Sequence, residues 1–179
     1  MKNNNIILMG FMGVGKGSLA RELSKLTGRV SIDTDDLIES MENTRIKKIF
    51  EKEGEAHFRA IEKKLSHWLE QSVKDAIIST GGGFFHVGNL QEIGHVIYLE
   101  SSFNAILDRI NTFENAKKKL KKRPLLKNIA KAKELVSERH PKYMACADTI
   151  IQTEGKSSQQ IAKEIIKNVI EKNAETEAK

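Results

Sequence analysis

Cysteine, proline and long apolar runs are scarce in this chain of 179 residues. Its one cysteine, Cys146, cannot form an internal disulfide, which fits a protein of the reducing cytosol. There is no run of eighteen apolar residues and no secretory leader before the first apolar segment, so we expect a cytoplasmic protein with no membrane span. The two prolines form no proline-rich linker, and the length suits one well-buried α/β domain.

Outside one segment, the chain carries no excess of either charge. Residues 112–127 contain six lysines, one arginine and one glutamate, and they hold the whole formal net charge of +6. A nucleic-acid-binding groove would need basic residues spread over a face with aromatic side chains among them, so we expect no nucleic-acid partner. We interpret the segment as a mobile lid over a polyphosphate, although a solvated lysine-rich loop would have the same composition.

The glycine-rich stretch Gly10–Ser18 lies between an apolar run and an amphipathic segment. Residues 6–9 predict a strand, and leucines at positions 19, 23 and 26 recur at helical spacing. Strand, glycine loop and helix in this order are the context of a phosphate-binding loop, in which backbone N–H groups, the helix dipole and a lysine hold phosphates. The predicted nucleotide-binding residues are Gly13, Val14, Gly15, Lys16, Gly17 and Ser18.

One position of this loop departs from the usual G-x-x-x-x-G-K-[S/T] pattern, whose final hydroxyl coordinates Mg²⁺. Gly17 stands at that position, and the nearest hydroxyl belongs to Ser18, one residue later. One residue turns a helical side chain by about 100°, so Ser18 should not replace the missing ligand without adjustment. Ser18 is thus a candidate metal ligand at an unfavourable spacing. We expect fewer protein groups to hold Mg²⁺ here than in a phosphate-binding loop with the usual hydroxyl.

Short apolar segments alternate with helical patterns along the chain. The predicted strands lie at 6–9, 30–32, 76–79, 96–99 and 149–151. The predicted helices lie at 17–27, 37–41, 46–50, 56–69, 103–110, 130–146 and 161–170, and Pro141 should kink or interrupt one of them. This alternation predicts an α/β, three-layer fold with a five-stranded parallel sheet flanked by helices. We expect one domain over residues 1–172, with the lid at about 112–127 and a disordered tail at 173–179.

A phosphate-binding loop occurs in ATPases, GTPases and small-molecule kinases. The residues that would bind the phosphate acceptor are therefore needed to distinguish these classes. A GTPase should have an N-K-x-D guanine motif, and this chain has none. A small-molecule kinase needs an acceptor pocket, an orienting carboxylate and a lid that excludes water. The chain has carboxylates at 33–36, where the second strand would end, and three glycines at 81–83 after the third strand. These features favour a small-molecule kinase.

Six segments, taken in order, resemble the motifs of the shikimate kinases. They are Gly10–Lys16, Asp33-Thr34-Asp35, Phe58-Arg59-Ala60-Ile61-Glu62, Ser79-Thr80-Gly81-Gly82-Gly83, Arg123-Pro124-Leu125-Leu126, and Glu138-Arg139 before Tyr143. Each motif alone is weak, but the ordered set spans most of residues 6–155. The resemblance implies a P-loop kinase fold and ATP-dependent phosphorylation of the 3-hydroxyl of shikimate, a step of chorismate and aromatic amino-acid synthesis.

The resemblance also implies roles for individual residues. The catalytic residues would be Lys16, Asp35 and Arg123, with Asp35 orienting or deprotonating the attacking hydroxyl. The shikimate-binding residues would be Asp35, Arg59, Gly81, Gly82, Gly83 and Arg139. The nucleotide-binding set would also include Arg109, Arg123 and Thr153. Asp33 would hold Mg²⁺ through water.

Other interpretations stay open at this point. Paired arginines suit any anionic acceptor, including that of a gluconate kinase or a nucleoside monophosphate kinase. Gly17 suits a nucleotide-binding regulatory protein with weak catalysis. Asp35 could merely cap a helix, and Arg59 with Glu62 could be an ordinary surface pair. No interface motif is evident, so a monomer is the default expectation.

Overall fold

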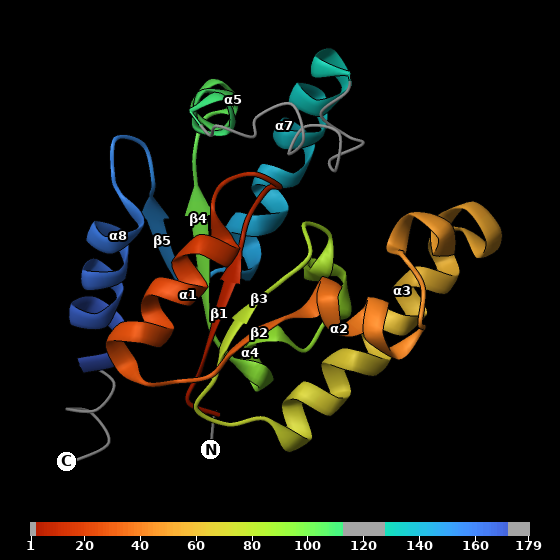
Figure 1. The fold of residues 1–179 in the computed structure, drawn as a ribbon, viewed down its shortest axis with the longest axis horizontal. Coiled ribbons are helices and arrows are strands. Elements are labelled where there is room, and N and C mark those ends of the chain that lie inside the picture. Colours follow the sequence, from red (N-terminus) through yellow and green to blue (C-terminus); the bar gives the residue numbers. More distant parts are fainter. Residues whose placement is uncertain (1–2, 113–127, 172–179) are drawn as a thin grey trace.

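The computed structural model describes residues 3–112 and 128–171, and within them the chain forms a five-stranded, all-parallel sheet in the order β2-β3-β1-β4-β5 (Figure 1). The strands are β1 (Asn5–Met9), β2 (Ser31–Asp33), β3 (Ile77–Ser79), β4 (Gly94–Glu100) and β5 (Thr149–Gln152). The helices are α1 (Lys16–Thr27), α2 (Thr34–Met41), α3 (Ile46–Ser72), α4 (Leu90–Ile93), α5 (Phe103–Asn111), α7 (Ile129–Cys146) and α8 (Ser158–Ile165), with a 3-10 turn η1 (Phe84–Val87) and a π-helical turn η3 (Ile166–Glu171). The predicted parallel sheet flanked by helices is confirmed.

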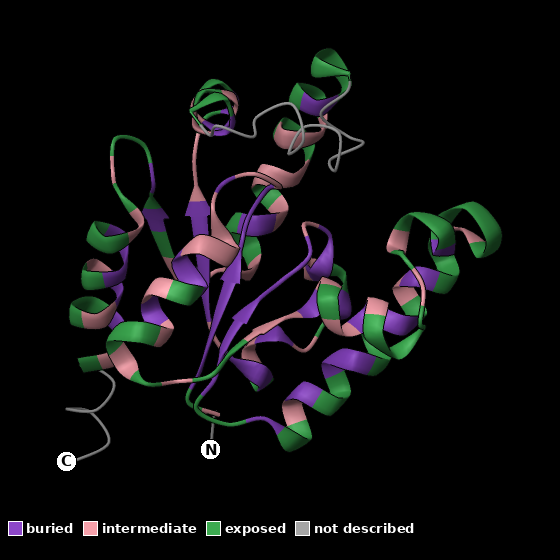
Figure 2. Cartoon of the chain, viewed as in Figure 1, coloured by how far each residue is buried: buried purple, intermediate pink, exposed green. Residues whose placement is uncertain are grey.

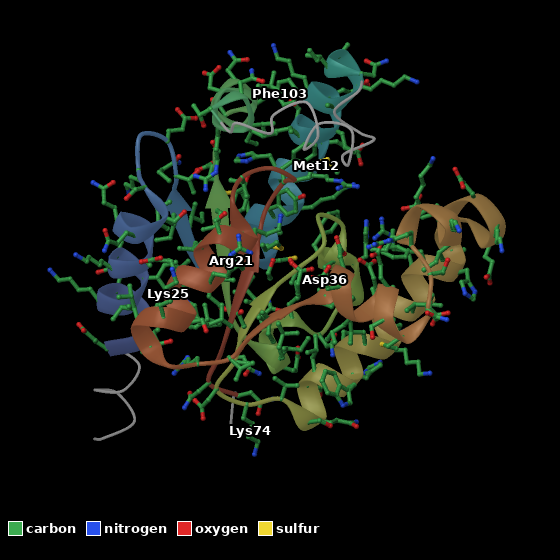
Figure 3. All side chains as sticks on the ribbon, in the orientation of Figure 1. Met12, Arg21, Lys25, Asp36, Lys74 and Phe103 are labelled. Carbon is green, nitrogen blue, oxygen red and sulfur yellow. The ribbon has the colours of Figure 1, made fainter. Side chains whose placement is uncertain are left out.

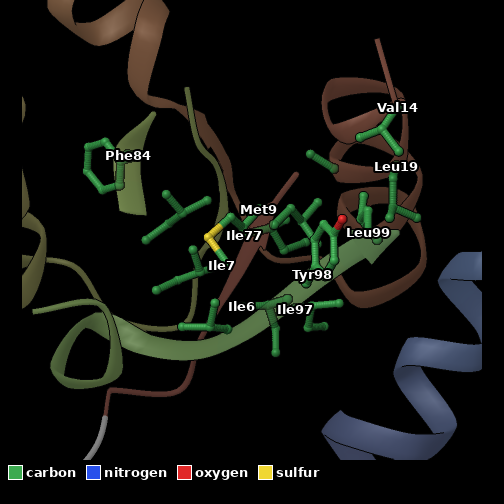
Figure 4. Close-up of a cluster of buried hydrophobic side chains, with 14 of the residues drawn as sticks. Ile6, Ile7, Met9, Val14, Leu19, Ile77, Phe84, Ile97, Tyr98 and Leu99 are labelled. Carbon is green, nitrogen blue, oxygen red and sulfur yellow. The ribbon is translucent and has the colours of Figure 1, made fainter. Parts of the chain in front are cut away.

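The central strand, β1, is buried on both faces. Ile7 pairs with Ile78 of β3 on one side and with Val96 of β4 on the other, and all three residues are fully buried. A strand covered on both faces needs a nearly continuous apolar run, and the sequence of β1 after Asn5 provides one. Figure 2 shows the resulting buried centre, and Figure 4 shows apolar side chains of β1, β3 and β4 packed beside Leu19 of α1.

Helices enclose the sheet in two layers. The chain passes from β1 to β2 in one direction along the sheet, and all later crossovers run the other way. Because crossovers between parallel strands are right-handed, α1 lies on the face opposite to α3, α4 and α7. The contacts agree, since α1 packs against β1, β2 and β3 and against α8, whereas α4 and α7 contact β4.

Two predicted helix breaks have different outcomes. The helices predicted at 46–50 and 56–69 belong to one element, α3, whose backbone leaves helical geometry at Gly54 (φ 80°, ψ 178°). The predicted interruption at Pro141 is wrong, because α7 continues through it to Cys146. A proline removes one backbone hydrogen bond, and the buried side chain of Tyr143 fixes the helix just beyond it.

Apart from Thr112, which ends α5, the predicted lid at 112–127 and the predicted tail at 173–179 lie outside the described residues. Among residues 3–112 and 128–171, no helix combines the length and the apolar character that a bilayer crossing requires.

A buried asparagine joins three elements at the amino-terminal edge of the sheet. The Asn5 side-chain amide donates to the carbonyl oxygens of Val73 and Ile93, both at 2.8 Å, and its oxygen accepts the Ala76 N–H at 2.9 Å. Asn5 is 0% exposed, so water cannot replace these three bonds. The side chain therefore ties β1 to the end of α3, to α4 and to the segment that enters β3.

Replacing Asn5 with Ala should lower the free energy of unfolding by about 2–4 kcal/mol, because three buried backbone groups lose their partner. Urea titration followed by circular dichroism measures this loss. The matched control is Asn4→Ala, at an exposed neighbouring position, which should change stability by less than about 0.5 kcal/mol. Equal effects of the two substitutions would contradict the role of Asn5.

Candidate active site

The glycine loop after β1 wraps around the amino terminus of α1. Gly15 precedes the helix with φ 112°, a left-handed conformation that favours glycine. Lys16 begins the helix, and its Nζ donates hydrogen bonds across the loop to the carbonyl oxygens of Gly10 at 2.7 Å and Phe11 at 3.1 Å. The first N–H groups of α1 have no carbonyl partner within the helix, so the loop and helix end together form an anion site.

Arg109 of α5 lies directly over this loop. A Cβ atom on Gly15 would lie 2.6 Å from Arg109 Nη2, so only glycine admits the guanidinium there. Nη2 also donates to Ser158 Oγ at 3.3 Å, at the start of α8. Thr153 lies after β5, and its N–H and hydroxyl both donate to the Glu100 carbonyl at 3.0 Å. Arg109 therefore borders the predicted phosphate site, whereas the Thr153 hydroxyl is used to join β5 to β4.

Asp33 ends β2 and caps α2. Its Oδ1 accepts the N–H groups of Asp35 at 3.0 Å and Asp36 at 3.4 Å, and its Oδ2 accepts the Ser79 hydroxyl at 2.9 Å. The capping residue is thus Asp33, and Asp35 is left to point its side chain toward the loop after β3.

The Asp35 carboxylate lies against Gly81. A Cβ atom on Gly81 would lie 2.5 Å from Asp35 Oδ1 and 3.5 Å from Glu62 Oε1. Burial, and next the negative charge of Asp33, raise the pKa of Asp35 to about 6, and the Lys16 ammonium opposes the rise. A carboxylate with that pKa is ionised at neutral pH and remains a better proton acceptor than an ordinary aspartate.

The three glycines after β3 each adjoin a different charged side chain. Gly81 faces Asp35 as described, and a Cβ atom on Gly82 would lie 3.3 Å from Arg139 Nη1. On Gly83 a Cβ atom would lie 2.5 Å from Arg59 Nη1. Side chains at 81 and 83 would collide with these groups, so the glycines allow one carboxylate and two guanidinium groups to converge on a single loop.

Two glutamates of α3 hold Arg59 in place. Arg59 Nη1 contacts Glu62 Oε2 at 2.5 Å, and its Nε and Nη2 contact Glu55 Oε1 at 3.1 and 2.8 Å. Burial raises the pKa of Glu62 while the Arg59 guanidinium opposes this shift. Glu62 is 1% exposed, so the interpretation of this pair as a surface contact is wrong.

Helix α7 approaches the same loop from the other side. Arg139 Nη1 donates to the Gly82 carbonyl at 3.0 Å, and the Tyr143 hydroxyl donates to the same oxygen at 2.6 Å. Arg139 and Tyr143 are four residues apart on α7 and so share one helix face. The carbonyl of Gly82 therefore fixes α7 to the loop and orients Arg139.

Comparisons with known proteins agree with this geometry. The family model described as shikimate kinase matches residues 12–170. A shikimate kinase of Helicobacter hepaticus is 41% identical over 162 residues, which cover 90% of this chain and 93% of that protein. One of Coxiella burnetii is 38% identical over 178 residues, covering 94% and 96%. The solved structure of the shikimate kinase from Acinetobacter baumannii in complex with shikimate has a TM-score of 0.79 and 31% identity, and covers 95% of this chain and 94% of that one.

This chain belongs to the shikimate kinase family. The resemblance inferred from the six motifs is therefore confirmed, and with it the assignment as an ATP-dependent phosphotransferase. Membership of this family decides against the gluconate-kinase and nucleoside-monophosphate-kinase alternatives.

The described part of the chain brings most of the predicted site residues to one edge of the sheet. The glycine loop, Asp33, Asp35, Arg59, Gly81, Gly82, Gly83 and Arg139 lie there, and Arg109 borders them. Arg123 lies outside the described residues. Among the described residues, no three His, Cys, Asp or Glu side chains are grouped as a metal site.

The sequence motifs include Glu62 and Tyr143, but no binding or orienting role was predicted for either residue. Glu62 lies three residues after Arg59 and beside the apolar residue Ile61. This spacing on a helix could have indicated that Arg59 and Glu62 form a buried pair. The four-residue spacing of Arg139 and Tyr143 was readable in the same way. Their common acceptor was not, because Gly82 is 57 residues away from Arg139 in the sequence.

Replacing Asp35 with Asn should stabilise the metal-free protein at pH 7. Asp35 has a pKa of about 6 in the folded chain against an ordinary value of 3.8, so the folded state binds more protons between these values. Its contribution to stability therefore falls as the pH rises from about 4 to about 6, and asparagine avoids that loss. We expect a gain of about 1–3 kcal/mol at pH 7 that shrinks at pH 4.

Urea titrations at the two pH values, in the presence of a chelator, measure this difference. The control is Asp36→Asn, which makes the same chemical change at the exposed next residue of α2. It should slightly destabilise the helix, because it removes a negative charge from the first turn. A gain for Asp35→Asn that is equally large at pH 4 would contradict the raised pKa.

Proposed function

We propose that this chain transfers the γ-phosphate of ATP to the 3-hydroxyl of shikimate, with Mg²⁺ on the nucleotide. The observation that carries the proposal is the triple-glycine loop, where Asp35, Arg139 and Arg59 converge on consecutive residues. A small acid with ring hydroxyls needs this combination, because guanidinium groups bind its carboxylate and a carboxylate accepts hydrogen bonds from its hydroxyls. The complex of the Acinetobacter baumannii relative with shikimate supports the same acceptor.

Arg59 and Arg139 would bind the acceptor carboxylate. A guanidinium has five N–H donors, and the two glutamates on α3 use one on each of the three Arg59 nitrogens. One donor therefore remains on each of Nη1 and Nη2, and both can donate to a substrate carboxylate. Because Glu55 and Glu62 already fix the plane of the guanidinium, binding loses little side-chain entropy.

Asp35 would act on the attacking hydroxyl. It lies between the glycine loop, whose Lys16 ammonium influences its pKa, and Gly81 of the acceptor loop. From this position its carboxylate can accept the hydroxyl proton as the new oxygen–phosphorus bond forms. Phosphoryl transfer depends mainly on positioning and charge stabilisation, so orienting the hydroxyl is the larger part of this role.

The nucleotide phosphates would bind at the glycine loop. The N–H groups of the loop and of the first turn of α1, the Lys16 ammonium and the Arg109 guanidinium supply the positive charge. Mg²⁺ would neutralise phosphate charge, with Asp33 nearby to accept hydrogen bonds from its water ligands. We propose that Arg123 and the lid at 112–127 close over the phosphates, and that the chain acts as a monomer.

A turnover assay tests the acceptor. Purified protein with Mg-ATP is given shikimate, gluconate or a panel of nucleoside monophosphates, and ADP release is measured. We expect turnover with shikimate and a rate at the level of acceptor-free controls with the others. Turnover with a different acceptor and none with shikimate would reject the proposal.

Replacing Arg59 with Lys should raise the KM for shikimate about 10–100-fold and leave the KM for ATP within about twofold. Lysine keeps the charge but loses the planar fork that two glutamates now orient. The control is Arg45→Lys, which makes the same change at a 79% exposed side chain paired with Glu39. Steady-state kinetics with each substrate varied in turn measures both constants, and equal changes in the two KM values would contradict the assignment.

A further inference from the structure

Gly17, at the position where phosphate-binding loops place a metal-coordinating hydroxyl, is not required by the fold. Among the described residues, and apart from its chain neighbours and the nearby backbone of α1, a Cβ atom built there meets one atom within 4 Å, Arg21 Nη1 at 3.8 Å, which is ordinary contact. Gly15, by contrast, would place a Cβ atom 2.6 Å from Arg109. Gly17 also lies inside α1, where glycine is about 0.5–1 kcal/mol less favourable than alanine. A Cβ atom therefore fits at position 17, so crowding around that atom does not explain why this chain has glycine there.

Ser18 does not replace that hydroxyl. Its side chain is displaced around α1 by one residue, and its Oγ lies 3.5 Å from Arg21 Nη2. Arg21 lies on α1 (Figure 3), and its guanidinium lies beside both position 17 and Ser18. A cation at this place disfavours a second cation bound directly to the Ser18 oxygen.

Asp33 is also occupied. Its Oδ1 accepts two backbone N–H groups that begin α2, and its Oδ2 accepts the Ser79 hydroxyl. Direct coordination of a metal would compete with the helix cap, which is typically worth about 1 kcal/mol. Each carboxylate oxygen can accept more than one hydrogen bond, so Asp33 can still accept one from a metal-bound water.

We propose that Mg²⁺ in this enzyme is held by nucleotide phosphates and water alone, with no protein atom as a direct ligand. The inference rests on the proposed use of Mg-ATP and concerns the same site. Mg²⁺ gives up its water reluctantly and commonly keeps several water ligands in proteins, so such a site is chemically ordinary. The protein contacts the ion through its water shell, at Asp33, while Lys16 and the loop hold the phosphates.

The first test compares the affinities of two nucleotide complexes by calorimetry. One is Mg-ATP, and the other is ATP bound through its β- and γ-phosphates to tetraammine cobalt(III), whose ammonia ligands do not exchange and so exclude a protein ligand. The two complexes differ in charge, so their affinities for one protein are not compared directly. Instead, the affinity of each complex is compared between the natural protein and its variants. Gly17→Ser should tighten Mg-ATP about 5–20-fold and leave the cobalt complex within about twofold.

The matched control is Gly17→Ala, which adds the same Cβ atom and raises helix propensity but supplies no oxygen. It should leave the ratio of the affinities for the two complexes unchanged. Ser18→Ala should likewise leave the ratio of the two affinities unchanged. A selective loss of Mg-ATP affinity in Ser18→Ala would overturn the inference, because it would identify Ser18 as the ligand. So would equal tightening of both complexes by Gly17→Ser.

A direct count of ligands decides the matter for the natural sequence. Mn²⁺ replaces Mg²⁺ in the complex with ADP, and electron paramagnetic resonance with oxygen-17 water and oxygen-17 phosphate counts the bound oxygens. We expect water and phosphate oxygens to fill all six positions, and one fewer water in Gly17→Ser. If water and phosphate supply five or fewer of the oxygens in the natural protein, the inference is rejected even if shikimate turnover is normal. If they supply all six and shikimate is not turned over, only the proposed acceptor is rejected.

Discussion

Hydrogen bonds between strand ends hold the site together. The Leu8 carbonyl of β1 accepts both the N–H and the hydroxyl of Thr80 at 3.1 Å, just beyond β3. The Thr34 hydroxyl, just beyond β2, accepts the Gly81 N–H at 2.9 Å. These bonds fix the glycine loop, the Asp33–Asp35 segment and the triple-glycine loop relative to one another, which a parallel sheet makes possible because all its strands end at one edge.

Buried carboxylates at the candidate site work against the stability of the fold. Burial raises the pKa values of Asp35 and Glu62, which means that the folded chain holds their charges at a cost. The isoleucine-rich core and buried hydrogen bonds such as those of Asn5 offset this cost. Buried charge held in a fixed arrangement at one edge of a sheet is what a preorganised site requires.

The absence of a hydroxyl at Gly17 leaves the phosphate cradle intact. The cradle consists of backbone N–H groups and the Lys16 ammonium, which binds across the loop to Gly10 and Phe11. None of these depends on the side chain at position 17. The phosphate cradle can therefore be kept without a metal-coordinating hydroxyl in this loop, because its backbone N–H groups and the Lys16 ammonium do not involve a side chain at position 17.

The sequence by itself determined the parallel sheet, the phosphate loop, the family and most of the candidate site residues, because apolar periodicity and motif spacing are local signals. It also showed that Gly17 departs from the usual pattern of a phosphate-binding loop, which has serine or threonine at this position. Only the tertiary structure decided that Asp33 caps α2, that Glu62 is buried and that Pro141 leaves α7 uninterrupted. The joining of Arg139 and Tyr143 at the Gly82 carbonyl was likewise decided by the tertiary structure. These features depend on contacts between residues far apart in the chain, which determine desolvation and hydrogen-bond partners and leave no periodic trace in the sequence.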